Sequence, residues 1–364
     1  MIEGAALANI LGFDIGGANT KAAFIRTHNF QVMELKTGME YFPIWKRGKA
    51  ELPALLKKFA GQLASHGGID AIGVTMTAEL SDVYQTKREG VNHVLDCVVQ
   101  CFPSTPIHVL NVEAEMIPVE EARKHYLTVA SANWAATGWM VSRLIGNCIV
   151  VDTGSTSTSI IPIVEGRIAA EGKTDLEKLA NGELVYTGAL RTNIAAIVGH
   201  VPLRGRMVRV SSELFAQSGD VHLLLGNISE EDYSVDTADG RGKSKAEAMA
   251  RLARVVCADI EMLSQEEIME IARFIYERQV DQIAEGLMQV YTRIQPRVNG
   301  KLPVAITGIG GKFLGGKAAE RVGIKDIIDL SEKLGANAAA ITPCIGVALM
   351  TAEKIEGEIR WKLL

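Results

Sequence analysis

Residues 10–21 read ILGFDIGGANTK, and this stretch decides the fold. An apolar run ends at Asp14, two glycines follow, and a second apolar run begins after Lys21. This order predicts two strands joined by a tight polar turn. At such a turn backbone N–H groups, hydroxyls and an ammonium surround one small volume, which is an arrangement that binds phosphate.

The same device occurs a second time, because residues 148–158 read CIVVDTGSTST, with Asp152 in the position of Asp14. Repetition of the whole strand-turn-strand motif predicts two related domains that face each other. A third apolar run opens into glycines at 304–316, VAITGIGGKFLGG. The backbone there must turn sharply or lie close to another group, such as a ligand.

Strands and helices alternate along the rest of the chain, which predicts an α/β fold. A chain of 364 residues is long enough for two domains, here expected at 1–130 plus 338–364 and at 131–337. The apolar periodicity predicts strands at 69–75 and 106–111 and helices at 51–66, 131–145, 243–257, 264–294 and 336–354.

Composition excludes several classes of function. The net charge of −5 is spread without a basic block, so neither nucleic acid nor an acidic membrane surface is an expected partner. No apolar stretch reaches the length of a membrane span, and the amino-terminal residues lack the features of a secretory signal. Five cysteines without metal-binding spacing suit a reducing cytoplasm. A homo-oligomer remains open.

The two loop acids point to a divalent cation. Carboxylates repel phosphate, but Asp14 and Asp152 can hold Mg²⁺ or its waters, which bridge phosphate oxygens. We expect both acids to face one cleft. The predicted phosphate-binding residues are Gly16, Gly17, Asn19, Thr20, Thr153, Gly154, Ser155 and Thr156.

Four further features are candidates for the site. Arg191 lies in the acid-free segment 184–212 and can bind an anion, although this segment can equally be a solvated face. Glu79 follows an apolar run and is either a proton acceptor or a loop acid. Asp236 and Asp239 form either a second metal site or an ordinary turn. The third glycine run offers an adenosine-type or substrate loop, with Gly308, Gly310, Gly311 and Lys312.

Taken together, the three loops resemble the phosphate and adenosine loops of the actin, sugar kinase and Hsp70 ATPase superfamily. Residues 12–21 and residues 74–82, VTMTAELSD, resemble its hydantoinase/oxoprolinase branch. Residues 237–243, TADGRGK, together with the short chain, resemble the branch members linked to tetrahydromethanopterin C1 metabolism. The resemblance implies two actin-like (ribonuclease H-like) domains with a phosphate-type cleft between them.

The resemblance also implies a reaction. That group includes a methanofuran-pathway transferase that joins a furanmethyl diphosphate to the phenolic amine γ-glutamyltyramine, forming an ether and releasing pyrophosphate. Lys21 would then contact the diphosphate rather than pair with an acid, and Glu79 would take the phenolic proton. A divalent cation would be required and ATP would not.

Two alternatives use the same loops. One is an ATP-dependent kinase or ligase-like enzyme, and the other is an ATP-switched binding protein. The Asn-Asp dipeptide that resembling sugar kinases use to activate a hydroxyl does not occur in the sequence. The chain is also far shorter than the hydantoinases and oxoprolinases.

Overall fold

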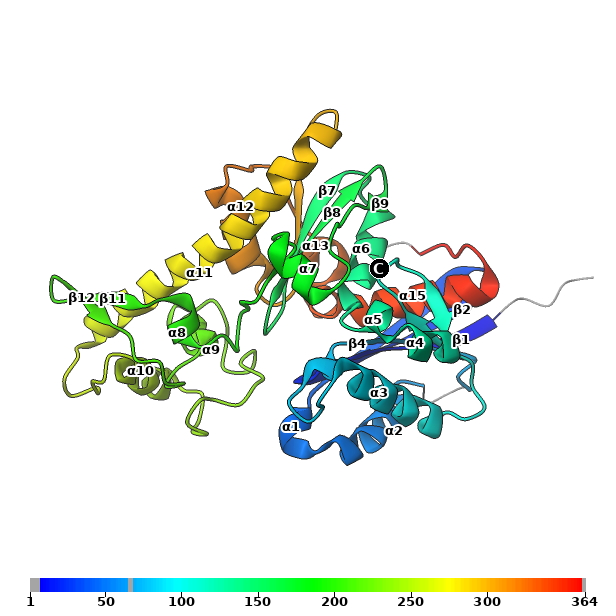
Figure 1. Ribbon diagram of the computed structural model, residues 1–364, viewed down its shortest axis with the longest axis horizontal. Coiled ribbons are helices and arrows are strands. Elements are labelled where there is room, and N and C mark those ends of the chain that lie inside the picture. The colour runs from blue at the N-terminus through cyan, green and yellow to red at the C-terminus, as the bar shows by residue number, and fades with distance from the viewer. Residues whose placement is uncertain (1–6, 65–67, 362–364) are drawn as a thin grey trace, which may run out of the picture. The chain divides into compact units, whose positions relative to one another are not determined.

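The computed structural model of the protein describes residues 7–64 and 68–361 (Figure 1). The chain divides into two compact units. Unit 1 comprises Met1–Gly146, Glu165–Glu177 and Ser331–Leu364, and unit 2 comprises Asn147–Val164 and Lys178–Leu330. The boundary expected near residue 130 therefore lies inside unit 1. None of the described helices is long and apolar enough to cross a membrane.

Unit 1 is built on a six-stranded sheet in the order β3-β2-β1-β4-β5-β6. The pairs β1–β2 and β2–β3 are antiparallel, whereas β1–β4 and β4–β5 are parallel. The strands are β1 (Leu7–Ile15), β2 (Asn19–His28), β3 (Gln31–Tyr41), β4 (Ala71–Met76), β5 (Ile107–Leu110) and β6 (Met116–Pro118).

Helices cover both faces of this sheet. One face packs on the amphipathic helices α2 and α3, and the other packs on α15, which is buried along most of its length (Figure 1). The helical elements of unit 1 are α1 (Ile44–Arg47), η1 (Lys49–Glu51), α2 (Leu52–Leu63), η2 (Ala78–Leu80), α3 (Lys87–Cys101), α4 (Val119–Lys124), α5 (Tyr126–Val129), α6 (Asn133–Ser142), α13 (Ser331–Leu334), α14 (Ala336–Ala339) and α15 (Thr342–Glu356).

Two glycines bring α15 against the middle of the sheet. A Cβ at Gly12 of β1 would lie 2.5 Å from the carbonyl oxygen of Cys344, and a Cβ at Gly73 of β4 would lie 2.2 Å from Thr351 Oγ1. These distances are below van der Waals contact, so only glycine fits at either position. The strand β1, which carries Asp14 near its end, is therefore held close to the first turn of α15.

Unit 2 repeats the sheet of unit 1. Its order is β10-β8-β7-β13-β14, in which β10–β8 and β8–β7 are antiparallel and β7–β13 and β13–β14 are parallel. The same order and directions occur in β3-β2-β1-β4-β5, so the predicted pair of ribonuclease H-like folds is confirmed. The strands are β7 (Cys148–Thr153), β8 (Thr158–Val164), β10 (Leu184–Val185), β13 (Val304–Thr307) and β14 (Ile327–Asp329). The short β9 (Arg167–Ile168), which follows β8 in the chain, belongs to unit 1.

The long connection from β10 to β13 forms the rest of unit 2. Its core contains a buried ion pair, in which Arg251 Nε donates to Asp220 Oδ1 at 2.8 Å. The elements are α8 (Ile194–Ile197), the hairpin β11 (His200–Leu203) and β12 (Arg206–Arg209), α9 (Ser218–Leu224), α10 (Lys245–Arg254), α11 (Gln265–Ile294) and η3 (Gln295–Arg297). The π-helical turn η4 (Gly311–Gly316) and α12 (Lys317–Arg321) follow β13, and α7 (Asp175–Ala180) begins in unit 1 and ends in unit 2.

The predicted α/β class is confirmed, and one predicted helix is wrong. The single helix expected over 336–354 is interrupted after Ala339, and α15 begins only at Thr342 with Pro343 in its first turn. Proline is favoured in that turn because its missing N–H has no partner there in any case. Helix α3 was not predicted, although its first residue, Lys87, belongs to the site described below.

Candidate active site

Asp14 lies near the end of β1, directly between two polar neighbours. The strand registers pair it with Lys21 of β2 and with Thr75 of β4. Opposed residues point to the same face of a sheet, so the three side chains lie together. Lys21 Nζ is 3.4 Å from Asp14 Oδ2. The expectation that Lys21 does not pair with an acid is therefore wrong, because the hairpin register places the two residues opposite each other.

Several polar atoms around this first loop are buried and have no hydrogen-bond partner in the part of the chain that the structure describes. They are Asp14 Oδ1, Thr20 Oγ1 and Thr75 Oγ1. Burial raises the pKa of Asp14, and the ammonium of Lys21 opposes this shift. Buried polar atoms are nearly always paired in native proteins, so this cluster indicates a place for a polar ligand. Thr75 was not among the predicted residues, although its position at the end of the neighbouring parallel strand could have identified it.

The turn of the first loop packs against the segment that follows β4. A Cβ at Gly17 would lie 2.4 Å from Ser81 Oγ, and a Cβ at Gly16 would lie 3.3 Å from Thr77 Oγ1. The Gly16 N–H donates to the carbonyl of Asn19 at 3.0 Å, which closes the turn. The two glycines therefore allow the segment carrying Glu79 to approach the loop.

Glu79 is in the one-turn helix η2 and is 1% exposed. Its Oε1 accepts a 2.6 Å hydrogen bond from Ser131 Oγ and lies 3.8 Å from Lys87 Nζ, while Oε2 has no partner. Burial raises the pKa of Glu79 to about 7, against the opposing effects of Ser131 and Lys87. A carboxyl group with this pKa can accept a proton near neutral pH. Ser131 and Lys87 carry no sequence signal that would have pointed to Glu79.

The amino-terminal end of α15 lies near the first loop. Cys344, in the first turn of α15, is buried, and both Asp14 and Lys21 act electrostatically on its thiol. The N–H groups in the first turn of a helix carry partial positive charge. This end of α15 therefore favours an anion beside Asp14 and Lys21.

The second loop in unit 2 is held by residues 190 and 191 of the following segment. The N–H groups of Leu190 and Arg191 donate to the carbonyl of Ser155, at 2.9 and 3.0 Å. Arg191 Nη1 donates to Thr156 Oγ1 at 3.1 Å. The structure therefore places Arg191 directly on the loop predicted to bind phosphate.

The third glycine run lies against this second loop. Thr307 is paired with Asp152, as Thr75 is with Asp14 in unit 1. Gly308 has φ of +84°, and a Cβ there would lie 2.7 Å from Asp152 Oδ1. The Gly310 N–H donates to the carbonyl of Thr153 at 2.9 Å, whereas Lys312 is exposed.

A family model described as hydantoinase/oxoprolinase matches residues 70–353. The chain belongs to the hydantoinase/oxoprolinase family. The match includes Glu79, the second loop and the third glycine run, and the first loop precedes it. The expected family is therefore confirmed.

Two relatives have the same name, (4-{4-[2-(γ-L-glutamylamino)ethyl]phenoxymethyl}furan-2-yl)methanamine synthase. The one from Methanocaldococcus jannaschii is 38% identical over 348 residues, which are 95% of this chain and 98% of the relative. The one from Methanococcus vannielii is 36% identical over 215 residues, 58% of this chain and 94% of the relative. Among solved structures, nucleotide-free acetone carboxylase matches with a TM-score of 0.56 at 11% identity, over 95% of this chain and 70% of that one, and so shares the fold.

Asp239 and Asp14, two of the acids predicted to bind a cation, differ in whether their carboxylate oxygens already have partners. Asp239 Oδ1 accepts from Arg251 Nη1 at 3.2 Å and Oδ2 accepts from Arg254 Nη1 at 2.9 Å, so this acid is held by two arginines. The backbone oxygen of Asp236 accepts from the Gln217 side chain. Within residues 7–64 and 68–361 no three His, Cys, Asp or Glu side chains cluster as metal ligands. Mg²⁺ commonly takes only one or two carboxylates, with phosphate oxygens and water, and the unpaired Asp14 Oδ1 fits this donor set.

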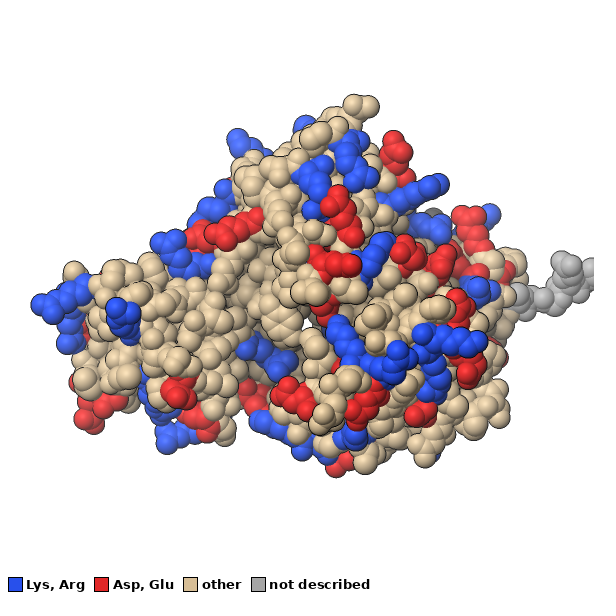
Figure 2. All heavy atoms as spheres, viewed as in Figure 1, with Lys and Arg blue, Asp and Glu red and all other residues tan. Residues whose placement is uncertain are grey.

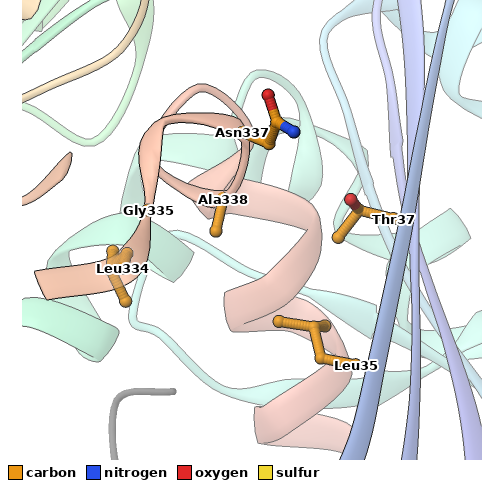
Figure 3. A pocket seen from close by; sticks show the side chains of 6 residues that line it. All are labelled: Leu35, Thr37, Leu334, Gly335, Asn337 and Ala338. Carbon is orange, nitrogen blue, oxygen red and sulfur yellow. The ribbon is translucent and has the colours of Figure 1, made fainter.

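One surface pocket of unit 1 offers no chemistry comparable to that of the loops. An open pocket in unit 1 is lined by Leu35 and Thr37 of β3 and by Leu334, Gly335, Asn337 and Ala338 (Figure 3). These side chains include no titratable group and none of the predicted site residues. On the face shown in Figure 2, acidic and basic side chains are interspersed.

Proposed function

We propose that this protein is a transferase that forms an aryl ether in methanofuran biosynthesis. The observation that carries the proposal is the 38% identity over 98% of the length of the Methanocaldococcus jannaschii synthase. The name of that synthase describes a furan joined through a phenoxymethyl group to a γ-glutamylaminoethyl chain. We infer that the reactants here are a furanmethyl diphosphate bearing an aminomethyl group and the phenolic amine γ-glutamyltyramine.

The proposed reaction balances without ATP. The bond between the furanmethyl carbon and the diphosphate oxygen breaks, and its electron pair leaves with pyrophosphate. The phenolic oxygen forms the new bond to the same carbon and loses its proton to a base. The products are the ether, pyrophosphate and one proton, and the leaving diphosphate supplies the driving force.

The first loop supplies groups that stabilise the leaving diphosphate. Lys21 and the amino-terminal end of α15 provide positive charge, and the unpaired hydroxyls of Thr20 and Thr75 provide hydrogen bonds. A bound divalent cation would neutralise diphosphate oxygens, and Asp14 would hold it through Oδ1. In unit 2, Arg191 and Thr156 offer a further set of donors for an anion.

Glu79 is the proposed proton acceptor for the phenol. It lies on the segment that packs against the first loop, and its Oε2 has no hydrogen-bond partner among residues 7–64 and 68–361. With a pKa of about 7 the carboxyl is partly ionised at neutral pH and can take a proton. We also assign the reaction to the cytoplasm, because the five cysteines are free and suit a reducing compartment.

The test is product formation by the purified protein. The protein is incubated with both substrates and Mg²⁺ but without ATP, and the ether and pyrophosphate are measured by mass spectrometry and a coupled assay. We expect both products in equal amounts, none after chelation of divalent cations, and strongly reduced turnover for Asp14→Asn. Product that forms only with ATP, with ADP appearing in step, would contradict this function and favour a kinase or ligase.

A further inference from the structure

We propose that Ser131, Lys87 and Asp175 are positioning residues that set the protonation of Glu79, and with it the pH at which the enzyme accepts a proton. The inference rests on the proposed function for its catalytic meaning. Its structural basis lies within unit 1 and is independent of the identity of the substrate.

Residues from separate parts of the chain surround Glu79: Ser131 and Lys87 contact its carboxyl, and Asp175 contacts Lys87. Ser131 lies in the loop before α6, Lys87 is the first residue of α3, and Asp175 is the first residue of α7. Helix α3 is held tightly against Glu79, because a Cβ at Gly90 would lie 2.5 Å from the Glu79 Cα. This packing fixes the place of the carboxyl relative to its neighbours.

Ser131 is held in an unusual backbone conformation. Its φ is +53°, the left-handed region that non-glycine residues rarely adopt, and the residue is 6% exposed. The preceding residue, Ala130, forms a parallel bridge to Met76 at the end of β4. Backbone strain of this kind persists only where the surrounding structure enforces it. Here the enforced conformation presents the hydroxyl to Glu79 Oε1 at 2.6 Å.

Lys87 is shared between two acids. Its Nζ lies 3.8 Å from Glu79 Oε1 and 3.3 Å from Asp175 Oδ2. The ammonium favours the ionised form of Glu79. Asp175 lies closer to the ammonium than Glu79 does, and its negative charge disfavours the ionised form of Glu79. Tyr84 also faces this group, but burial raises its pKa so that it stays neutral, and its hydroxyl is bonded to His93 Nδ1.

These neighbours act on Glu79 in opposite directions. Burial is the largest influence and raises its pKa, the Ser131 hydrogen bond and the Lys87 charge lower it, and the Asp175 charge raises it. The balance leaves the carboxyl near the middle of its titration at neutral pH, with Oε2 free to exchange a proton with a ligand.

The sign of each shift provides the test. Ser131→Gly removes the hydroxyl and also relieves the left-handed strain, so the fold should be retained. A hydrogen bond to a charged group is worth about 1.5 to 3 kcal/mol, so this variant should raise the pKa of Glu79 by about one to two units. Lys87→Met should also raise the pKa, and Asp175→Asn should lower it. Ala114→Gly, which relieves a similar positive φ of +57° at another loop, is the matched control and should leave Glu79 unchanged.

Two measurements separate this inference from the proposed function. The first is the pH titration of the Glu79 carboxyl by ¹³C NMR on glutamate-labelled protein, with Glu79→Gln to assign the signal. The second is the pH dependence of kcat/KM for ether formation, which should shift with the NMR value. Titrations of Ser131→Gly and Lys87→Met that match wild type would overturn the positioning roles even if ether forms. If the titrations of the variants are shifted but the wild-type protein forms no ether, the positioning roles are retained and the proposed function is rejected.

Discussion

The ion pair of Asp14 and Lys21 determines the charge that a ligand meets at the first loop. Lys21 Nζ lies 3.4 Å from one carboxylate oxygen, while the other oxygen is buried without a partner. A ligand that arrives with negative charge therefore meets an ammonium that already balances one buried acid. The lysine can stabilise the ligand and at the same time favour the ionised form of Asp14, against the effect of burial.

We predict that Lys21→Met lowers turnover about 30-fold to 1000-fold, since a charge-assisted contact to a buried oxyanion contributes about 2 to 4 kcal/mol. Steady-state kinetics of ether formation provide the measurement. Lys36→Met is the control, because this lysine is on the neighbouring strand β3 and pairs with Glu34 at 2.8 Å. Equal losses in the two variants would remove Lys21 from the site.

We predict that the titration of Glu79 makes the free energy of unfolding depend on pH. Its pKa is raised from 4.5 to about 7 in the folded state, so the folded protein retains the proton where the unfolded chain loses it. The free energy of unfolding should therefore contain a contribution that is full below pH 4.5 and is lost as the pH rises through 7. Its size is about 3 kcal/mol, at 1.4 kcal/mol per pKa unit.

Urea unfolding of wild type and Glu79→Gln between pH 4 and pH 8 measures this contribution. The glutamine variant cannot ionise at this position, so its stability should decline less with increasing pH across that window. The same dependence on pH in both proteins would show that Glu79 titrates normally.

At the scale of elements, close packing of α15 on β1 and β4 depends on glycine. We predict that Gly12→Ala destabilises the protein by about 1 to 3 kcal/mol, because the added methyl group would overlap the backbone of α15. Gly61 in α2 is the matched control, since among the described residues a Cβ built there meets no atom within 4 Å beyond its chain neighbours and the backbone of its own helix. Gly61→Ala should stabilise by about 0.5 to 1 kcal/mol, the cost of glycine inside a helix. Chemical denaturation measures both, and a neutral Gly12→Ala would mean that α15 can move away from the sheet.

At the scale of the molecule, unit 1 is assembled from three separate segments of the chain. Its last segment contributes α15, which buries one face of a sheet formed by the first segment. We predict that a chain ending at Leu330 loses the fold of unit 1, because residues such as Ile10 and Ile25 would lose the helix that covers them. Hydrogen exchange should show fast-exchanging amides in β1 and β4 but protected amides in β7 and β13. Protection of β1 and β4 equal to that in the full-length chain would contradict this dependence.

The sequence by itself determined the fold class, the family and both loops. Each of these depends on local order: an apolar run, an acid and a glycine turn predict a hairpin wherever they occur, and their repetition predicts two similar folds. Glu79 could also be found, because it follows a strand-like run. Only the tertiary structure showed which side chains lie beside Asp14 and Glu79. Strand register paired Lys21 with Asp14 and placed Thr75 beside them, and folding brought Ser131, Lys87 and Asp175 to Glu79. Lys21 is only seven residues from Asp14, and the register of their hairpin decides that they pair. Thr75, Ser131 and Asp175 come from distant segments, so no local pattern encodes their positions, and the burial that shifts the pKa of Glu79 exists only once the chain has folded.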